Sequence, residues 1–308
     1  MNKSHVYGPV PSRRLGLSLG VDILPFKVCT LDCVYCQLGP TNQKTTEIKD
    51  YFSEEKILSQ IKKRIETAQH IDFITFSGSG EPTLNSRLGP LIEKIKTFTD
   101  IPVAVLTNST LLTQKKVRDS LKQADLVVPS LDAATQEVFE TINRPHPLIR
   151  IHDVIEGLKK FRKEFHGQIW LEIILVKGVN DSDSHIKALK KVIQEIKPDK
   201  VQLNTVIRPP SEKSALALNQ KEMERIKRHL GNNCEIVADF KKRGLTSEEE
   251  NLKDLIFDMI CRRPVTAEDI SNSLGRHRNE VIKYIDLLKK EDKIKSVPYE
   301  NKDYYEPK

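Results

Sequence analysis

Three cysteines that lie close together are the residues of this chain best suited to metal chemistry. Cys29, Cys33 and Cys36 fall within eight residues, separated by three and then by two positions. Thiolates suit iron–sulfur clusters and zinc alike, but structural zinc needs a fourth Cys or His, and cubane clusters usually take four cysteines. The next cysteine is Cys234, and residues 6–69 contain no histidine. Three ligands therefore favour a [4Fe–4S] cluster with one open iron, as catalysis requires, over zinc or a loop of free thiols.

Segments that predict strands and helices alternate on both sides of these candidates. The predicted strands are residues 18–24, 72–76, 103–106, 126–128, 169–176 and 201–207. The predicted helices lie near 53–69, 91–98, 113–122 and 184–196, and a longer helical region ends near residue 165. The opening residues 5–14 have two prolines and a glycine and predict a loop. Such alternation favours a parallel sheet, and six units are too few for a closed eight-stranded barrel. Ligand groups gather at the carboxyl ends of parallel strands, and the cysteine loop follows the first of them.

The cysteine spacing, with Tyr35 just before the third cysteine, resembles the signature of the radical S-adenosylmethionine (SAM) enzymes. The resemblance covers roughly residues 5–240. It implies a partial (β/α)6 TIM-like barrel, in agreement with the six units. It also implies that the open iron of a [4Fe–4S] cluster chelates SAM. One electron from the cluster then cleaves the sulfonium bond to give a 5′-deoxyadenosyl radical that abstracts hydrogen. We expect an electron donor such as flavodoxin or ferredoxin.

The resemblance also assigns cofactor-binding residues at successive strand ends. Tyr35 would lie beside the adenine. The segment Gly78–Pro82 would hold the amino group of SAM, because its glycines allow close backbone approach and Glu81 can receive an ammonium. The alternative for this segment is an ordinary tight turn. Residues at the next two strand ends would hydrogen-bond the ribose or the carboxylate. The full set is Tyr35, Gly78, Ser79, Gly80, Glu81, Pro82, Thr107, Asn108, Ser130 and Asp132.

Further segments are similar to one branch, the wyosine-forming tRNA enzymes, which condense pyruvate carbons onto methylguanosine. They are residues 130–133, 143–145, 175–180 and 202–204. The archaeal members carry extra cysteines upstream for a second cluster, whereas residues 1–28 contain none. Their Schiff-base lysine cannot be placed by motif either. The family placement therefore predicts tRNA or other RNA as substrate, but the wyosine reaction does not follow.

Charge also bears on the substrate. Residues 1–246 hold 38 Lys+Arg against 29 Asp+Glu, while residues 247–308 hold 12 against 14. The excess predicts an anionic substrate at the barrel, such as RNA or a phosphorylated metabolite, with a lysine-rich solvated surface as the alternative. The candidate substrate contacts are Arg13, Arg14, Lys177, Asn204 and Arg208, for which surface or core roles are the alternative.

The composition changes near residues 241–250, which predict a linker between a barrel domain of residues 1–240 and a smaller domain of residues 251–308. Helical spacing, a third helix and a hairpin make the latter resemble a winged helix. Arg276, His277, Arg278 and Lys283 would begin its recognition helix, where groove contacts are made. Winged helices also bind proteins. The net charge of residues 247–308 is slightly negative, which does not favour contact with nucleic acid. Cys234 and Cys261 are expected to be buried thiols.

The remaining features exclude some classes of protein. A chain of 308 residues suggests two domains. No apolar run approaches the ~20 residues of a membrane span, and the first residues lack the apolar stretch of a signal peptide. Free thiols and a reducible cluster favour the cytoplasm. Three functions compete: radical SAM chemistry on RNA, the same chemistry on a protein or small metabolite (including activation of a glycyl radical enzyme), and an iron–sulfur winged-helix regulator. A regulator would not need the motifs Gly78–Pro82 and Thr107–Asn108, which follow the second and third predicted strands.

The cysteine triad gives the first prediction. Replacing Cys29, Cys33 and Cys36 by Ala should abolish the cluster, because no other thiol lies nearby in the sequence. Iron and sulfide analysis after anaerobic reconstitution measures this. Cys234→Ala and Cys261→Ala are the matched controls and should keep a full cluster. A full cluster in the triple variant would contradict the assignment.

Overall fold

The computed structural model describes most of the chain. The described residues are 5–12, 14–68, 70–207, 210–237, 252–274, 281–282, 284–285, 288–289, 291–300 and 302–308. Among them, no helix is long and apolar enough to cross a membrane.

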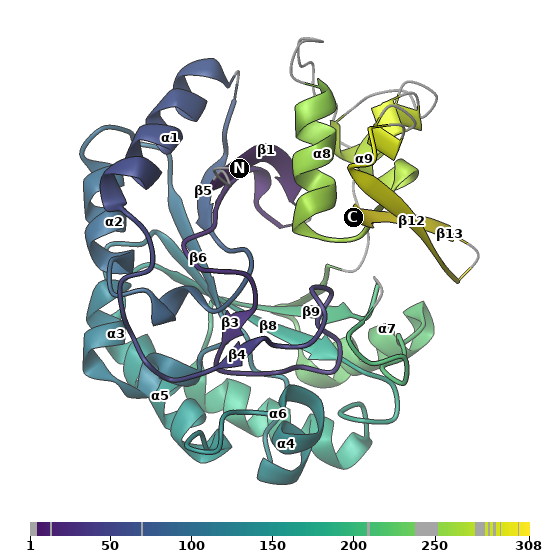
Figure 1. Cartoon of the computed structure of the whole chain (residues 1–308). Coiled ribbons are helices and arrows are strands. Elements are labelled where there is room, and N and C mark those ends of the chain that lie inside the picture. Colours follow the sequence, from purple (N-terminus) through teal and green to yellow (C-terminus); the bar gives the residue numbers. More distant parts are fainter. Residues whose placement is uncertain are drawn as a thin grey trace.

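An eight-stranded, mostly parallel sheet forms the larger part of the protein (Figure 1). Its strands, in spatial order, are β1 (Val6–Ser12), β2 (Gly16–Val21), β5 (Phe73–Phe76), β6 (Val103–Thr107), β7 (Leu126–Pro129), β8 (Gln168–Leu175), β9 (Lys200–Thr205) and β10 (Cys234–Ile236). Strands β2 to β10 are parallel, and only β1 is antiparallel to its neighbour. The carboxyl ends of seven strands therefore meet at one edge. A short parallel pair, β3 (Val28–Cys29) and β4 (Gln43–Lys44), lies in the loop that follows β2.

Helices connect the parallel strands and bury one apolar face each. They are α1 (Glu54–Thr67), α2 (Leu88–Lys96), α3 (Lys115–Ser120), α4 (Gln136–Asn143), α5 (Ile151–Glu164), α6 (Asp183–Ile196) and α7 (Gln220–Leu230), with short 3-10 turns η1 (Pro82–Leu84) and η2 (Thr110–Thr113). Helix α1 buries Ile57 and Ile61, and the side chain of Ser53 caps its first turn. Asn219 and Glu222 form a capping box at the start of α7. Helix α7 was not predicted from the sequence.

Six predicted strands and the helices between them are confirmed, with ends shifted by a few residues. The helical region ending near residue 165 is two helices, α4 and α5, because Arg144 adopts a left-handed conformation that stops α4. The prediction of a loop over residues 5–14 is wrong, since β1 occupies residues 6–12. Its prolines are tolerated because β1 is an edge strand with one neighbour. Strand β10 was not predicted.

Three apolar clusters account for the packing of the described residues, the smallest being Leu15, Ala104, Leu126 and Val128 around strands β6 and β7. The largest joins the sheet to its helices, with Phe76, Leu91 and Phe161 fully buried. Another is confined to residues after 251 and includes Ile256, Ile270 and Leu288. The prediction that Cys234 is a buried thiol is confirmed, whereas Cys261 is half-buried rather than buried.

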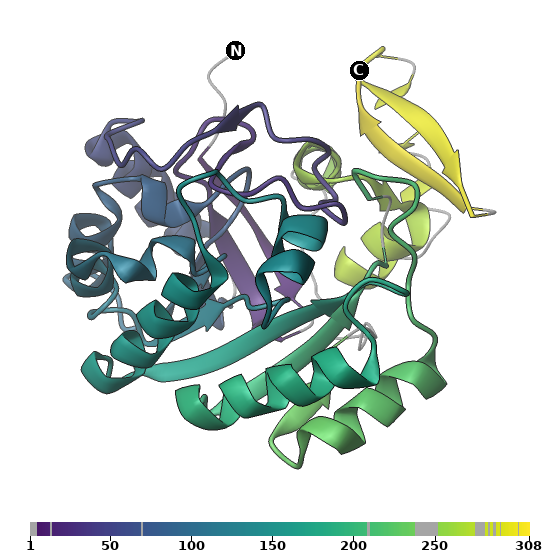
Figure 2. The same cartoon turned by 90° about the horizontal axis from the view of Figure 1, so that it is seen from below.

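The C-terminal residues form α8 (Leu252–Arg262), β11 (Val265–Thr266), α9 (Ala267–Leu274), β12 (Ile294–Tyr299) and β13 (Lys302–Pro307). The strands make a small sheet in the order β11-β13-β12. Helix α8 lies beside β1 in both views (Figures 1 and 2). Arg262 forms an ion pair with Asp22 at 2.8 Å and stacks on Tyr7, 4.5 Å from its ring centre.

The predicted linker 241–250 and the predicted groove residues Arg276, His277, Arg278 and Lys283 lie outside the described residues.

Because the apolar cluster of residues 252–305 shares no residue with the other clusters, the larger part should fold without the C-terminal part. A chain ending near residue 243 should keep cluster and SAM binding, and should lose or weaken its engagement of a macromolecular partner. Loss of α8 uncovers β1 and removes the partner of Asp22. We therefore also expect a lower midpoint in chemical denaturation of the reconstituted protein. Loss of the cluster on truncation would show instead that α8 is an integral part of the α/β fold.

Candidate functional site

A cavity of ≈ 430 Å³ opens where the parallel strands end. Most of the predicted site residues line this cavity, although they are far apart in the sequence. The predicted site residues that line it are Cys29, Tyr35, Cys36, Gly78, Ser79, Gly80, Glu81, Thr107, Asn108, Ser130, Arg14 and Asn204. The geometry thus brings the cysteine loop, the glycine segment and the next strand ends to one space.

The cysteine loop is held in place by the end of α4. The backbone N–H of Asp32 donates to the carbonyl of Asn143 at 2.9 Å, and that of Val34 donates to Ile142 at 3.0 Å. The last carbonyls of a helix have no partner within the helix and need one outside it. The loop supplies those donors, so helix and loop position each other.

Each of the three thiols has a nitrogen donor from a different part of the chain. Asn108 Nδ2 lies 3.5 Å from Cys29 Sγ, and Asn143 Nδ2 lies 3.3 Å from Cys33 Sγ. The ammonium of Lys27 lies 3.1 Å from Cys36 Sγ. Hydrogen bonds to ligating sulfurs are a common feature of iron–sulfur sites and tune their potentials. The donor set therefore fits thiolates that bind a cluster.

Burial opposes ionisation of these thiols when no metal is bound. It raises the pKa of Cys29 to about 11, and that of Cys33 further. Cluster binding must then release protons, since only thiolates ligate iron. Within the described ranges, no three Cys, His, Asp or Glu side chains are arranged to share one metal ion.

The glycine segment packs directly on the residues before Cys29. The Lys27 N–H donates to the Ser79 carbonyl at 2.6 Å, and the Glu81 N–H donates to the Val28 carbonyl at 3.1 Å. A Cβ on Gly80 would lie 2.0 Å from that same carbonyl. Glycine is required at position 80 so that the segment can approach the cysteine loop.

Glu81 is buried and joins the second strand end to the third. Its carboxylate accepts from the hydroxyls of Thr83 and Thr107, both at 2.6 Å, and from the N–H groups of Thr83 and Asn108. Burial raises its pKa, while these hydrogen bonds oppose the rise. The assignment of Glu81 to the SAM ammonium stays a prediction. The structure shows a carboxylate that ties two loops of the site together.

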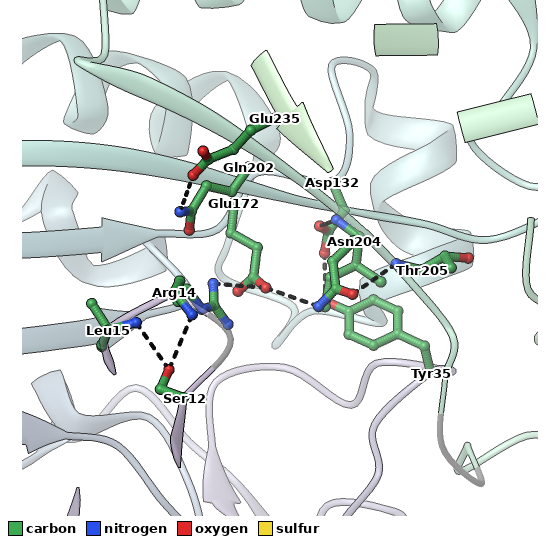
Figure 3. A network of polar contacts seen from close by, with 11 residues as sticks. Ser12, Arg14, Leu15, Tyr35, Asp132, Glu172, Gln202, Asn204, Thr205 and Glu235 are labelled. Carbon is green, nitrogen blue, oxygen red and sulfur yellow. Dashed lines mark hydrogen bonds and ion pairs between the residues drawn. The ribbon is translucent and has the colours of Figure 1, made fainter. Parts of the chain in front are cut away.

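Asp132 has a similar role on the other side of the cysteine loop (Figure 3). It accepts from the Tyr35 hydroxyl at 2.5 Å, from Asn143 Nδ2 at 2.8 Å and from the Ile174 N–H at 2.8 Å. Burial raises its pKa to about 6, against these donors. Tyr35 and Cys33 therefore share one network with Asn143, which the sequence flagged only as part of a family segment.

The candidate substrate residues divide into two groups. Arg14 pairs with Glu172 at 2.8 Å, and Asn204 Nδ2 donates to the same carboxylate at 3.3 Å, inside the cavity (Figure 3). Lys177 does not reach the cavity, because it is half-exposed and pairs with Glu222 on α7 at 2.8 Å. Arg13 and Arg208 lie outside the described residues.

Two polar residues of the site, Lys27 and Asp22, were not predicted from the sequence. Lys27 is a buried cation with a left-handed backbone (φ 59°), which pattern reading cannot anticipate. Asp22 accepts from the Ser79 hydroxyl at 2.5 Å and pairs with Arg262 of α8. Its second partner lies 240 positions further along the chain.

Comparison with known proteins agrees with this geometry. Residues 23–189 match the model of the Radical SAM superfamily. The chain is 34% identical to UPF0026 protein MJ1312 of Methanocaldococcus jannaschii, covering 97% of this chain and 94% of that protein. It is 39% identical to a protein named GTPase Obg in Brachyspira hyodysenteriae, covering 96% of this chain but spanning 44% of that protein.

Two further similarities are weaker. A radical SAM methyltransferase from Sphaerobacter thermophilus has the same fold, with a TM-score of 0.56 at 17% identity over 71% of this chain and 65% of that one. Dual-specificity RNA methyltransferase RlmN of Alkalilimnicola ehrlichii is 28% identical over 57% of this chain and 49% of that protein.

This chain belongs to the radical SAM superfamily and, within it, to the UPF0026 proteins. It is a radical SAM enzyme, and its cofactors are a [4Fe–4S] cluster and SAM.

Lys27→Met tests the third sulfur contact. A nearby ammonium stabilises the more negative, reduced cluster. We therefore expect a lower reduction potential without it, by on the order of 60 mV for a one-electron difference of about 1.4 kcal/mol. A redox titration followed by electron paramagnetic resonance measures this.

The matched control is Lys96→Met, whose ammonium pairs with Asp125 before strand β7 and does not line the cavity. It should leave the potential unchanged. Equal potentials in wild type and Lys27→Met would show that the lysine only fills space.

Proposed function

We propose that this enzyme performs radical SAM chemistry on RNA, with tRNA as the expected substrate. The observation that supports the proposal best is the charge of the cavity. Arg14, Lys27, Arg262 and Arg263 line it, against the carboxylates of Glu81 and Glu172. A wall with more cations than anions favours a polyanionic substrate.

Two facts from the sequence support the same choice. The chain is basic overall, with a formal charge of +7. A distant relative, RlmN, is named as an RNA methyltransferase. The similarity to wyosine-forming enzymes stays a prediction about which branch of the superfamily this chain belongs to. It does not assign the wyosine reaction to this enzyme.

The finer architecture belongs to the same proposal. We take the sheet and helices of residues 1–240 as a partial (β/α)6 barrel, supported by six strands in sequential order β2, β5, β6, β7, β8 and β9. We take residues 251–308 as a winged-helix domain, supported by α8, α9, the β12–β13 hairpin and a separate apolar cluster. This domain would contact nucleic acid or protein, and a flavodoxin or ferredoxin would supply electrons.

The cysteines and the buried carboxylates of the site would have different roles. Cys29, Cys33 and Cys36 would bind the cluster, which on reduction supplies the electron that cleaves SAM. Glu81 and Asp132 fix the loops around the cofactors, and neither needs to move a proton to do so.

The chemistry can be tested without knowing the product. With dithionite, the reconstituted protein should cleave SAM to 5′-deoxyadenosine and methionine slowly, and faster when its RNA substrate is present. Chromatographic detection of 5′-deoxyadenosine, with and without bulk tRNA, measures both rates. The Cys29→Ala variant serves as the inactive control.

Stimulation by copurifying protein or by small metabolites, but not by RNA, would overturn the choice of substrate. A full, reducible cluster that never yields 5′-deoxyadenosine with any of these additions would contradict SAM cleavage itself.

A further inference from the structure

The charged residues that line the cavity are almost all paired. Arg14 pairs with Glu172, Lys27 contacts Cys36, Glu81 accepts four hydrogen bonds, and Arg262 pairs with Asp22. Arg263 is the exception. Among the residues that the structure describes, no side chain forms an ion pair or hydrogen bond with its guanidinium.

Arg263 nevertheless sits in a defined position. It follows the last residue of α8, and its neighbour Arg262 is held by Asp22 and by stacking on Tyr7. Those contacts fix the backbone from which Arg263 reaches the cavity wall. The residue is half-buried, and burial lowers its pKa, with Tyr7 and Asp269 opposing the change.

Arginine guanidinium groups keep their charge in proteins at neutral pH. Burying a charged group that has no partner costs desolvation free energy. An anion bound to the guanidinium would offset that cost. The planar guanidinium presents two parallel N–H groups that match the oxygens of a phosphate. The other lining cations, Arg14, Lys27 and Arg262, already contact Glu172, Cys36 and Asp22, so an incoming anion would find Arg263 without a partner among the described residues.

We propose that Arg263 binds a phosphate group of the substrate in this cavity. The inference deepens the proposed function, and it rests on that function only in taking the cavity as the substrate site. The C-terminal part of the chain then contributes a substrate-binding residue to a site otherwise built from strand ends.

Chemical modification tests the assignment on the full-length, reconstituted and SAM-bound protein. Phenylglyoxal labels accessible arginines, and peptide mass spectrometry follows each one. Inorganic phosphate should slow labelling of Arg263. It should not slow labelling of Arg150, which is exposed and lies outside this cavity. Equal protection by acetate would overturn the choice of phosphate, and no protection would overturn the site.

A binding measurement gives the size of the effect. Equilibrium dialysis with radiolabelled phosphate should show about tenfold weaker binding for Arg263→Gln, the loss expected for one charge-assisted hydrogen bond. Arg263→Lys should recover part of it, and Arg150→Gln should match wild type. Cluster content, measured as iron, verifies that the variants fold. Unchanged phosphate binding in Arg263→Gln would contradict the proposal.

The two proposals fail in different ways. Phosphate protection of Arg263 without stimulation of SAM cleavage by RNA would support this inference and reject RNA as the substrate. Stimulation by RNA without phosphate protection would reject Arg263 and leave RNA in place.

Discussion

The structure of this site depends on the hydrogen bonds that position the loop with Cys29, Cys33 and Cys36. A loop that carries metal ligands exposes many backbone groups, and buried groups of this kind need partners. Here the end of α4 satisfies one side of the loop, and the glycine segment satisfies the residues before Cys29. Hydrogen bonds from both flanks therefore position the loop that carries the thiols.

Buried carboxylates complete that arrangement. Glu81 and Asp132 are both nearly inaccessible, and each accepts at least three hydrogen bonds from protein donors. A buried charge is costly unless it is fully hydrogen-bonded, and these two are. Their donors come from different strand ends, so each carboxylate fixes the relative position of loops that the sheet alone would leave free.

Sequence reasoning recovered the parallel sheet and most of the cavity because those features have local signals. Alternating apolar segments located six strands, and motif spacing located Cys29, Gly78–Pro82 and Asn108. Lys177 shows the limit of that reasoning. It follows β8 as the site residues follow their strands, yet Glu222 holds it outside the cavity. Lys27, Asp22 and Arg263 were missed because their roles depend on tertiary contacts, which no local pattern encodes.

Asp22 joins two parts of the chain that lie far apart in the sequence. One carboxylate accepts from Ser79 in the glycine segment and from Arg262 at the end of α8. A ligand that draws Arg262 away from Asp22 changes the free energy of the glycine segment, and thermodynamic reciprocity makes the effect equal in the opposite direction. The cofactor side and the C-terminal part of the molecule are therefore energetically coupled through a single side chain. Any ligand that changes this shared contact would therefore change the affinity of the other side by the same factor.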